Sequence, residues 1–442
     1  MEKYLSNLLN TYNERYFYQK EYLDVLTQFI NSIKDDHDLV HKFKQTNFLE
    51  NFFNPNRIIT FKVPWYDDSG NLNINTGYRV QHSNALGIYK GGIRFHKTVN
   101  ESVLKMLAFE QTLKNSLTNL PLGGAKGGSD FDPMYKSKAE KRRFSESFMI
   151  ELNKYIGPNI DVPAGDLGVS GDEIAYMYSI YKRITNKTDG VLTSKHHSFG
   201  GSLLRPESTG YGIAYVTNKI LDLYFKEKLL NKKIVISGTG QVGFNTALKV
   251  KELGGTIIAI SNIDGVIYNE DGIDLNILKN ILDLEININN YLDSYPDTIF
   301  YEDIKKLWTI NADILIPCAT QFEINEDDAL NIIKNKPMLV VEGSNKPTTS
   351  DAANILKQNN ILVVPSKAAN SGGVIVSNFE MIQNSTFTKW TSSEVDLKLK
   401  IQMETIIDTI YNEATTLNDI NNLEKASNIV SIKRLYEAIR LL

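Results

Sequence analysis

The stretch that decides the fold runs from Lys232 to Gly265 and reads K-K-I-V-I-S-G-T-G-Q-V-G-F-N-T-A-L-K-V-K-E-L-G-G-T-I-I-A-I-S-N-I-D-G. It predicts a buried strand over 234–237, a glycine-rich turn, an amphipathic helix and a second strand over 256–261. A G-x-G-x-x-G motif alone is a weak signal, but one that follows a strand and opens a helix within about 30 residues is specific. We therefore expect a Rossmann-type dinucleotide-binding unit here.

Each glycine of the motif has a physical role in such a unit. Gly238 makes the tight turn, Gly240 lets the backbone approach the pyrophosphate, and Gly243 allows close helix packing. The amide groups and the dipole at the start of the helix favour the phosphates. Gln241 is compatible with this loop, because its position needs only a side chain that clears the phosphates.

The choice of nicotinamide cofactor depends on the end of the second strand. Asp264 lies roughly 20 residues past Gly243, where an acid accepts hydrogen bonds from the ribose 2′-hydroxyl of NAD. No Arg or Lys lies in 261–265, and the nearby Glu285 is acidic where a 2′-phosphate would need a base. NAD is therefore favoured, while NADP stays open because Asn262 at the strand end tolerates a phosphate.

Three more apolar runs fit the same sheet, over 313–318, 338–343 and 361–365. Each run ends in a polar or glycine-bearing loop, and such carboxyl-end loops face the ligand in a doubly wound sheet. Asn345 and Asn370 are thus candidates for contacts to ribose or nicotinamide. N-capping of a helix would explain either residue equally well.

The second organising stretch is P-L-G-G-A-K-G-G over 121–128. We expect a loop whose glycines do not serve packing but remove side-chain bulk, so that a small ligand can approach Lys126. A lysine in a desolvated, cation-crowded cleft has a lowered pKa and can act as a base. The alternative is a surface turn with a solvated lysine.

The rest of the first half predicts helices over 1–50, a hairpin about 68–70, a loop over 84–96, and helices over 100–117 and 138–155. Asn100 is the expected N-cap of the helix over 100–117, whose Gln111 and Lys114 project from nearly the same face. Asp166 lies in a Pro/Gly turn, and 193–206 is a connection of low periodicity.

The C-terminal part predicts helices from Val374 onward, which we expect to pack back on the first domain because the sheet is already complete. The expected fold is therefore α/β. A substrate and oligomerisation domain over 1–203 precedes a Rossmann-type domain over 204–375, and a helical segment over 376–442 returns to the first domain.

Composition bounds the function. The 442 residues carry a formal net charge of -4, which provides no basic field for nucleic acid. The lone Cys318 excludes an internal disulfide and a cysteine-based metal site, and we expect it to be a small buried hydrophobe. The sequence shows neither a secretory leader nor an apolar run of about 18 residues, so we expect no membrane association and a cytoplasmic protein.

Seven motifs together resemble the glutamate dehydrogenase branch of the amino acid dehydrogenase family. They are K-G-G-I-R-F-H, F-E-Q-T-L-K-N, P-L-G-G-A-K-G-G-S-D-F-D-P, D-V-P-A-G-D-L-G, F-G-G-S-L-L-R-P-E-S-T-G-Y-G, P-C-A-T-Q and A-A-N-S-G-G-V. The resemblance covers nearly the whole chain. It implies reversible oxidative deamination of L-glutamate to 2-oxoglutarate and ammonia with a nicotinamide cofactor, in a homohexamer.

The resemblance also implies roles for individual residues, and it implies no metal site. Lys126 and Asp166 match the catalytic pair. The implied substrate-binding residues are Lys90, Gly92, Gln111, Lys114, Gly165, Arg205 and Ser377. The implied cofactor-binding residues are Thr209, Gly238, Gly240, Gln241, Val242, Gly243, Asn262, Asp264, Ala319, Thr320, Asn345 and Asn370.

The chemistry of these residues agrees with the implied reaction. Lys126 can activate the water that attacks an iminium and stabilise the developing oxyanion, while Asp166 moves the amine proton. Two nearby lysines are expected to lower the pKa of Lys126 by like-charge repulsion. A turn-capping aspartate, and solvated charges at Lys90 and Lys114, are the structural alternatives.

Lys90 separates substrates within the family, because a buried unpaired ammonium is costly against an alkyl side chain. It favours a dicarboxylic substrate over the substrates of a leucine, valine or phenylalanine dehydrogenase. A non-catalytic dinucleotide-binding subunit is the alternative from another class. The K-H-H run over 195–197 departs from the family pattern, and we interpret it as a solvated loop.

Overall fold

The computed structural model describes residues 2–441, which form two compact units. Unit 1 consists of Met1–Leu203, Val374–Ser392 and Asn428–Leu442. Unit 2 consists of Leu204–Gly373 and Ser393–Ser427. This grouping differs from the expected division in the C-terminal part, because Ser393–Ser427 packs with the dinucleotide-binding unit and not with the first one.

Unit 1 begins with the expected helices, α1 (Glu2–Arg15), α2 (Lys20–Ile33), α3 (His37–Thr46) and α4 (Phe48–Phe52). Their apolar residues recur at helical spacing and become the buried side, with Phe29 and Phe52 packed against Phe109. Asp36 caps α3 by accepting from the amide of Leu39.

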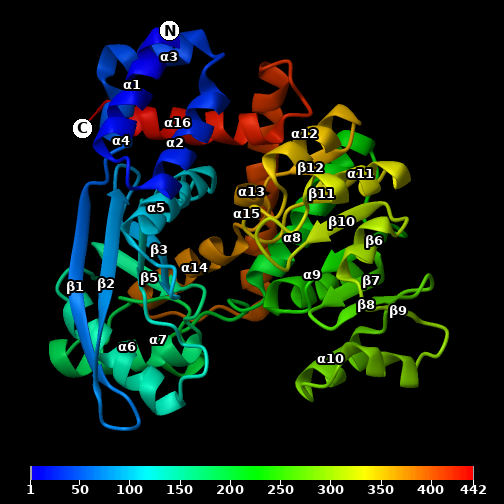
Figure 1. The fold of residues 1–442 in the computed structure, drawn as a ribbon, viewed down its shortest axis with the longest axis horizontal. Coiled ribbons are helices and arrows are strands. Elements are labelled where there is room, and N and C mark those ends of the chain that lie inside the picture. Colours follow the sequence, from blue (N-terminus) through cyan, green and yellow to red (C-terminus); the bar gives the residue numbers. More distant parts are fainter. Residues whose placement is uncertain (1, 442) are drawn as a thin grey trace. The chain divides into compact units, whose positions relative to one another are not determined.

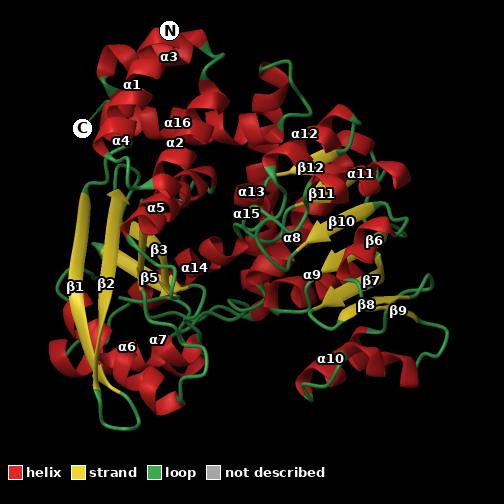
Figure 2. Ribbon diagram, viewed as in Figure 1, coloured by secondary structure: helices red, strands yellow, loops and turns green. Residues whose placement is uncertain are grey.

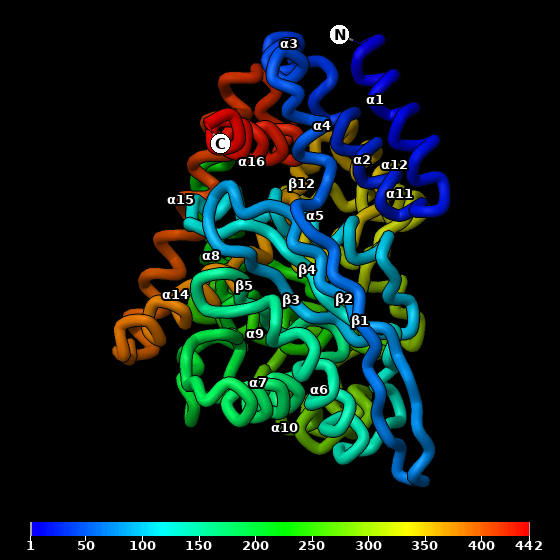
Figure 3. Tube along the Cα trace, turned by 90° about the vertical axis from the view of Figure 1, so that its left-hand side faces the viewer, coloured from blue at the N-terminus to red at the C-terminus, as the bar shows by residue number. Residues whose placement is uncertain are grey.

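A five-stranded sheet forms the centre of unit 1. The expected hairpin is present as β1 (Arg57–Tyr66) and β2 (Leu72–Ser83), which run side by side in Figures 1 and 3. The order is β1-β2-β4-β3-β5, with β3 (Tyr89–Phe95) parallel to both β4 (Gly124–Ser129) and β5 (Asp161–Gly165). The strands β4, β3 and β5 therefore end at the same edge of the sheet.

Helices complete unit 1 around this sheet. The helix α5 (Glu101–Leu117) begins at the predicted N-cap, since Asn100 accepts from the amide of Val103. The helices α6 (Lys138–Leu152) and α7 (Gly171–Thr185) begin with capping boxes and share an aromatic-rich core with β1 and β3. The helix α14 (Gly372–Thr386) follows much later in the chain.

Two expected loops are wrong, because 89–95 and 124–129 are strands. The glycines serve the close approach of neighbouring backbones. A Cβ at Gly91 would lie 1.7 Å from the carbonyl oxygen of Ala125, and a Cβ at Gly128 would lie 2.4 Å from that of Arg94. The four glycines around Lys126 are thus packing residues, contrary to our expectation, and they make room for a buried sheet.

Unit 2 contains a seven-stranded sheet with the order β12-β11-β10-β6-β7-β8-β9 (Figure 2). Its parallel part is β6 (Lys233–Ser237), β7 (Thr256–Asn262), β10 (Ile314–Pro317), β11 (Leu339–Val341) and β12 (Leu362–Val364), as expected from the apolar runs. The sequence analysis missed β8 (Gly265–Tyr268) and β9 (Ile299–Tyr301), which extend the sheet in antiparallel fashion.

Helices pack on the sheet of unit 2, and an apolar cluster fills one of its faces. The cluster joins the sheet to η4 (Ile304–Thr309), α11 (Glu326–Asn335) and α12 (Ser350–Gln358). The other helical elements of unit 2 are α8 (Ser208–Ile220), η2 (Leu221–Phe225), α9 (Gln241–Glu252), α10 (Leu275–Asp283), η3 (Ile288–Asp293), α13 (Ser366–Ala369) and α15 (Ser392–Thr416). The helix α16 (Leu423–Ile439) lies mostly in unit 1, as does η1 (His197–Phe199). None of the helices over residues 2–441 has the length and apolar character needed to cross a membrane.

Candidate active site

The lysine and the aspartate singled out from the sequence meet across strand β3. Lys126 lies in β4, and Asp166 directly follows β5, with β3 between these two strands. Lys126 Nζ is 3.1 Å from Asp166 Oδ2. Gly92 lies between them, because a Cβ there would be 2.8 Å from Cβ of Asp166 and 3.4 Å from Lys126 Nζ. The structure thus joins three predicted site residues in one place.

Arg94 belongs to the same charge cluster and was not predicted. Its Nε donates to Asp166 Oδ2 at 2.8 Å, which is the oxygen that also faces Lys126. Burial alone would raise the pKa of Asp166, but the charges of Lys126 and Arg94 lower it to about 2. Asp166 is therefore a carboxylate at neutral pH.

Lys126 is almost completely buried, with 5% of its surface exposed. Burial lowers the pKa of its ammonium, Asp166 opposes that effect, and the positive charges of Arg94 and Arg79 add to the lowering. The lysines expected to supply the like-charge repulsion are not among these causes, and two arginines take their place. The arrangement favours a lysine that can release its proton.

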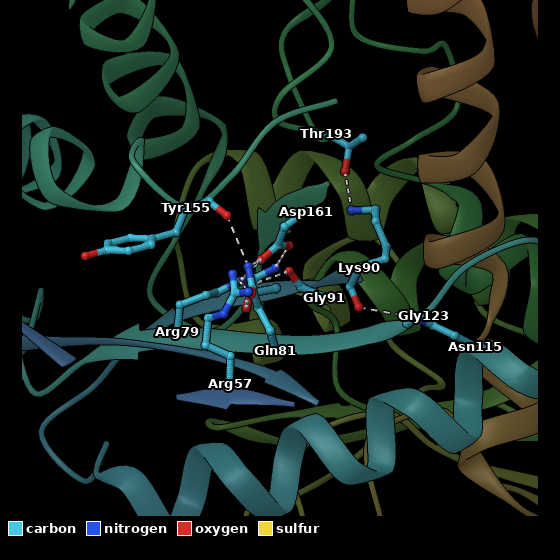
Figure 4. A network of polar contacts seen from close by, with 11 residues as sticks. Arg57, Arg79, Gln81, Lys90, Gly91, Asn115, Gly123, Tyr155, Asp161 and Thr193 are labelled. Carbon is cyan, nitrogen blue, oxygen red and sulfur yellow. Dashed lines mark hydrogen bonds and ion pairs between the residues drawn. The ribbon is translucent and has the colours of Figure 1, made fainter. Parts of the chain in front are cut away.

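Lys90 is held in a defined position on β3. Its Nζ donates to Thr193 Oγ1 at 2.7 Å, and its carbonyl oxygen accepts from Asn115 Nδ2 at 3.1 Å (Figure 4). Asn115 also donates to the carbonyl oxygen of Gly123 at 2.6 Å, so that α5 ties β3 to the start of β4. Lys90 is fully buried, which excludes the solvated surface charge considered as its alternative.

A buried ion pair between Arg79 and Asp161 supports strand β3. Arg79 of β2 donates to both carboxylate oxygens of Asp161, with Nε at 2.9 Å from Oδ2, and also to the carbonyl oxygen of Gly91 at 3.1 Å. Gln81 donates to Asp161 Oδ2 at 2.9 Å and to the carbonyl oxygen of Tyr155 at 3.1 Å (Figure 4). This network fixes the backbone between Lys90 and Gly92.

The remaining substrate-site candidates are distributed over both units. Gln111 packs against Gly91 and donates to Asn115 Oδ1 at 2.7 Å, while Lys114 is half-buried one helical turn further along α5. Gly165 is the last residue of β5, and Ser377 is buried in α14. Arg205 is in unit 2, unlike all the others.

The glycine loop of unit 2 has the geometry of a phosphate cradle. No atom lies within 4 Å of a Cβ placed on Gly240, whereas a Cβ on Gly243 would be 1.9 Å from the carbonyl oxygen of Gly238. Gly238 has φ +81, which favours glycine. Gln241 and Val242 begin α9, so their amides belong to the unpaired first turn of a helix. These residues fit a dinucleotide.

Asp264 is engaged with its own neighbourhood at the end of β7. Its Oδ2 accepts from Asn262 Nδ2 and from the amide of Ile288, both at 3.1 Å, and its amide donates to Asn262 Oδ1 at 2.8 Å. The carboxylate therefore braces the loop before η3. Its role as the ribose acid stays a prediction.

The carboxyl-end loops of β10, β11 and β12 lie at the same edge of the sheet as the glycine loop, and the loop after β10 contacts it. The amides of Cys318 and Ala319 donate to Ser237 Oγ at 2.8 and 3.2 Å. Asn370 donates to Asn345 Oδ1 at 3.0 Å, so these two candidates form one polar pair. Thr320 directly follows Ala319 in the loop after β10. Thr209 and Arg205 both lie close to Gly373.

Two predictions about single side chains have clear outcomes. Cys318 is buried, as expected, and burial raises the pKa of its thiol. The K-H-H run is only partly a solvated loop, because His196 and His197 are exposed whereas Lys195 is buried and paired with Glu380. Within residues 2–441 no three or more His, Cys, Asp and Glu side chains gather in a way that could hold a metal ion.

Comparisons with known proteins agree with this geometry. Residues 55–183 match the family model described as Glu/Leu/Phe/Val dehydrogenase, dimerisation domain. Residues 200–441 match the model described as Glutamate/Leucine/Phenylalanine/Valine dehydrogenase.

Similar proteins align over nearly their full lengths. The chain is 44% identical to the NAD(P)-specific glutamate dehydrogenase of Xylanibacter ruminicola over 425 residues, or 95% of both chains. It is 41% identical to the NAD-specific glutamate dehydrogenase of Clostridium symbiosum, covering 99% of this chain and 98% of that one. The crystal structure of Plasmodium falciparum glutamate dehydrogenase matches with a TM-score of 0.95 at 38% identity, covering 99% of this chain and 94% of the other.

Proposed function

The chain belongs to the glutamate/leucine/phenylalanine/valine dehydrogenase family, and we propose that Lys126 and Asp166 carry the chemistry of its glutamate dehydrogenase reaction. That reaction is the reversible oxidative deamination of L-glutamate to 2-oxoglutarate and ammonia, with NAD or NADP as hydride carrier. The observation that supports the two roles is the 3.1 Å contact between Lys126 Nζ and Asp166 Oδ2 beside Gly92.

The substrate is held by residues at both of its ends. Gln111, Lys114 and the backbone at Gly92 and Gly165 bind the α-carboxylate, and Lys90 pairs with the side-chain carboxylate with help from Ser377. The burial of Lys90 and its hydrogen bond to Thr193 Oγ1 at 2.7 Å support this assignment, because they hold the ammonium in a fixed position where a carboxylate can accept from it. Arg205 is retained as a further substrate-binding candidate.

When bound, NAD or NADP would supply the acceptor for the hydride that leaves Cα of the substrate. Lys126 in its neutral form takes a proton from the water that attacks the resulting iminium, and in its charged form it stabilises the oxyanion that develops. Asp166 is a carboxylate at neutral pH, so it can accept a proton from the substrate amine and return it when ammonia leaves.

The cofactor-binding assignment rests on the cradle at the carboxyl edge of the sheet in unit 2. The proposed residues are Thr209, Gly238, Gly240, Gln241, Val242, Gly243, Asn262, Asp264, Ala319, Thr320, Asn345 and Asn370. The open space at Gly240 and the free first-turn amides of α9 support the phosphate part. We favour NAD because no basic residue lies in 261–265.

We further propose that the protein assembles as a homohexamer and acts in the cytoplasm. A dimerisation-domain match over 55–183 supports self-association. In unit 1, β1 is an edge strand of ten residues with one unpaired side, which is a surface that another chain can cover. Light scattering on the purified protein is expected to give six times the chain mass of 50.0 kDa.

The first test is an activity panel on purified protein, read as absorbance of the reduced cofactor. L-Glutamate is paired with NAD and separately with NADP, and L-leucine is the control substrate. We expect glutamate with NAD to be the most active pair. Activity with leucine alone would contradict the assignment of Lys90, and silence of every pair would favour a non-catalytic subunit.

The role of Lys126 gives a sharper prediction. Lys126→Ala is expected to lower kcat at least about a hundredfold, because it removes the proton acceptor and the oxyanion charge together. Binding of NAD, measured by calorimetry, should be unchanged. Lys97→Ala is the control, since Lys97 is an exposed lysine of the same unit. A parallel loss of NAD affinity in Lys126→Ala would show that the residue acts elsewhere.

A further inference from the structure

We propose that Glu380 and Lys195 are positioning residues that hold the turn at 192–195 in place, so that Thr193 faces Lys90 and the site selects a substrate with a side-chain carboxylate. This inference deepens the proposed glutamate reaction and rests on it. All of the residues involved are in unit 1.

The pair is buried, and its contacts converge on one carboxylate. Lys195 Nζ donates to Glu380 Oε1 at 2.6 Å, and the two side chains are 1% and 0% exposed. The amide of Ser194 donates to Glu380 Oε2 at 3.0 Å, and the amide of Lys195 donates to Oε1 at 3.4 Å. Lys195 Nζ also donates to the carbonyl oxygen of Leu192 and so closes the turn. Glu380 thus binds the turn through both its backbone and its lysine.

The turn needs such an anchor because its backbone is strained. Ser194 has φ +69, a left-handed conformation that costs free energy for any residue other than glycine. Ser194 Oγ is buried and has no hydrogen-bond partner, so its own side chain does not stabilise the turn. The contacts from Glu380 are what offsets this strain.

Thr193 lies inside the anchored turn and connects it to the substrate site. Its Oγ1 accepts from Lys90 Nζ at 2.7 Å, and its amide donates to the carbonyl oxygen of Pro163 in β5 at 3.0 Å. Since β5 pairs with β3, and Lys90 lies opposite Val162, the turn and the lysine share one support. A displaced turn would remove the hydroxyl that orients the ammonium of Lys90.

The helix α14 carries the anchor on the same face as a predicted substrate residue. Ser377 precedes Glu380 by three positions, which places both on one side of the helix. Further along, Gln383 donates to Ser202 Oγ at 2.9 Å and Asn384 donates to the carbonyl oxygen of Gly200 at 2.7 Å. The helix therefore holds the connection 192–202 along its length, with Glu380 at the end nearest Ser377.

A structural role alone does not explain an ion pair at this place. A buried ion pair contributes little net stability compared with apolar side chains of the same volume, and its recurrent use is to fix one arrangement among several. The pair is therefore expected to act on substrate selection, through Thr193 and Lys90, more than on chemistry at Cα.

The test compares L-glutamate with L-norvaline, a five-carbon amino acid without the side-chain carboxylate. Glu380→Gln is expected to raise KM for glutamate on the order of tenfold, to leave kcat within a few-fold, and to lower the preference for glutamate over norvaline. KM for NAD should not change. The matched control is Asp396→Asn, which breaks a partly buried pair with Lys249 in unit 2 and should leave the preference as it is.

A rescue experiment separates an effect through the turn from a general loss of structure. Ser194→Gly accepts φ +69 without strain and keeps the backbone amide, so it should behave as the wild type. In the double variant with Glu380→Gln, it should lower KM for glutamate most of the way back to the wild-type value. If Glu380→Gln alone does not fold, the double variant, whose turn carries no strain, is compared directly with the wild type.

Each outcome bears on one of the two proposals. A wild-type protein without activity on glutamate overturns the proposed function. An active wild type whose glutamate preference survives both Glu380→Gln and Lys195→Met overturns the positioning role. So does a loss of preference in Glu380→Gln that the added Ser194→Gly does not reduce.

Discussion

Arg94 is a functional candidate at the scale of the single residue, and it sets the charge state of two others. It donates to the oxygen of Asp166 that faces Lys126, so that two cations and one anion meet within hydrogen-bonding distance. Its positive charge lowers the pKa of both Lys126 and Asp166. A general base on Lys126 must be deprotonated, which means that activity rises as the pH rises through the pKa of this lysine.

Replacement of Arg94 is expected to move the ascending limb of the pH profile, in which activity rises with pH. Arg94→Gln removes a like charge near Lys126, so the pKa of the lysine rises and the limb of kcat/KM shifts to higher pH by about one unit. Arg94→Lys keeps the charge and is the matched control. The measurement is kcat/KM for glutamate across pH in all three proteins. An unmoved limb in Arg94→Gln would show that the charge of Arg94 does not contribute to the pKa of Lys126.

The sequence predicted some of these residues and missed others for a physical reason. Lys126 and Asp166 belong to short motifs that the sequence alone displays, although the glycines around Lys126 serve packing and not the approach of a ligand. Arg94 and Thr193 acquire their roles only through pairing with residues 72 and 103 positions away. Neither periodicity nor local spacing carries information on such pairings, since these depend on the order of strands in the sheet.

At the scale of the element, glycines serve two different structural roles, and the number of glycines in a stretch does not tell which role applies. In 238–243 the glycines form a turn and a helix start, as predicted. In β3 and β4 they lie within strands, because adjacent backbones approach more closely than a Cβ allows. The parallel strands of unit 2 were predictable from their apolar runs, whereas β8 and β9 are short and depend on pairing with β7.

Gly240 and Gly243 of the glycine loop lead to opposite predictions, because a Cβ on Gly240 would meet open space and a Cβ on Gly243 would meet a backbone carbonyl oxygen. Gly240→Ala meets no protein atom within 4 Å, so the melting temperature should stay the same while KM for NAD rises about tenfold or more, because the methyl group occupies phosphate space. Gly243→Ala would clash with the carbonyl oxygen of Gly238 and should lower the melting temperature. Thermal unfolding together with cofactor kinetics checks both. Equal melting temperatures in the two variants would contradict this division.

At the scale of the whole molecule, the end of the chain is part of the substrate-binding unit. Arg434 in α16 donates to the carbonyl oxygens of Ser116 and Leu120 at 2.8 and 2.9 Å, and so completes the C-terminal end of α5. Tyr436 packs its ring on Phe43 and Phe48 of the N-terminal helices. The helix that carries Gln111 and Lys114 is therefore held by residues from the last turns of the protein.

Loss of this tie should weaken both stability and substrate binding. Arg434→Met keeps roughly the volume of the side chain but removes two charge-assisted hydrogen bonds, at a cost of about 1–3 kcal/mol in the free energy of unfolding, while Ser116 and Leu120 keep the backbone amides of Asn119 and Leu122 as donors. KM for glutamate should rise, since α5 loses its fixed end. Arg440→Met is the control, because Arg440 forms an exposed pair with Glu437 and such pairs contribute little. Denaturant unfolding and kinetics on both variants provide the comparison.

The anchored turn of unit 1 also bears on how such a protein changes over evolutionary time. The proposed catalytic groups lie on β4 and just after β5, beside glycines of β3 and β4 where a larger side chain would meet neighbouring atoms. The turn at 192–195, which carries the hydroxyl facing Lys90, belongs instead to a connection that a few polar contacts join to α14. Mutation can therefore alter which amino acid is accepted without rebuilding the machinery that oxidises it, and a mutant library confined to 192–195 and α14 is the place to search for new substrates.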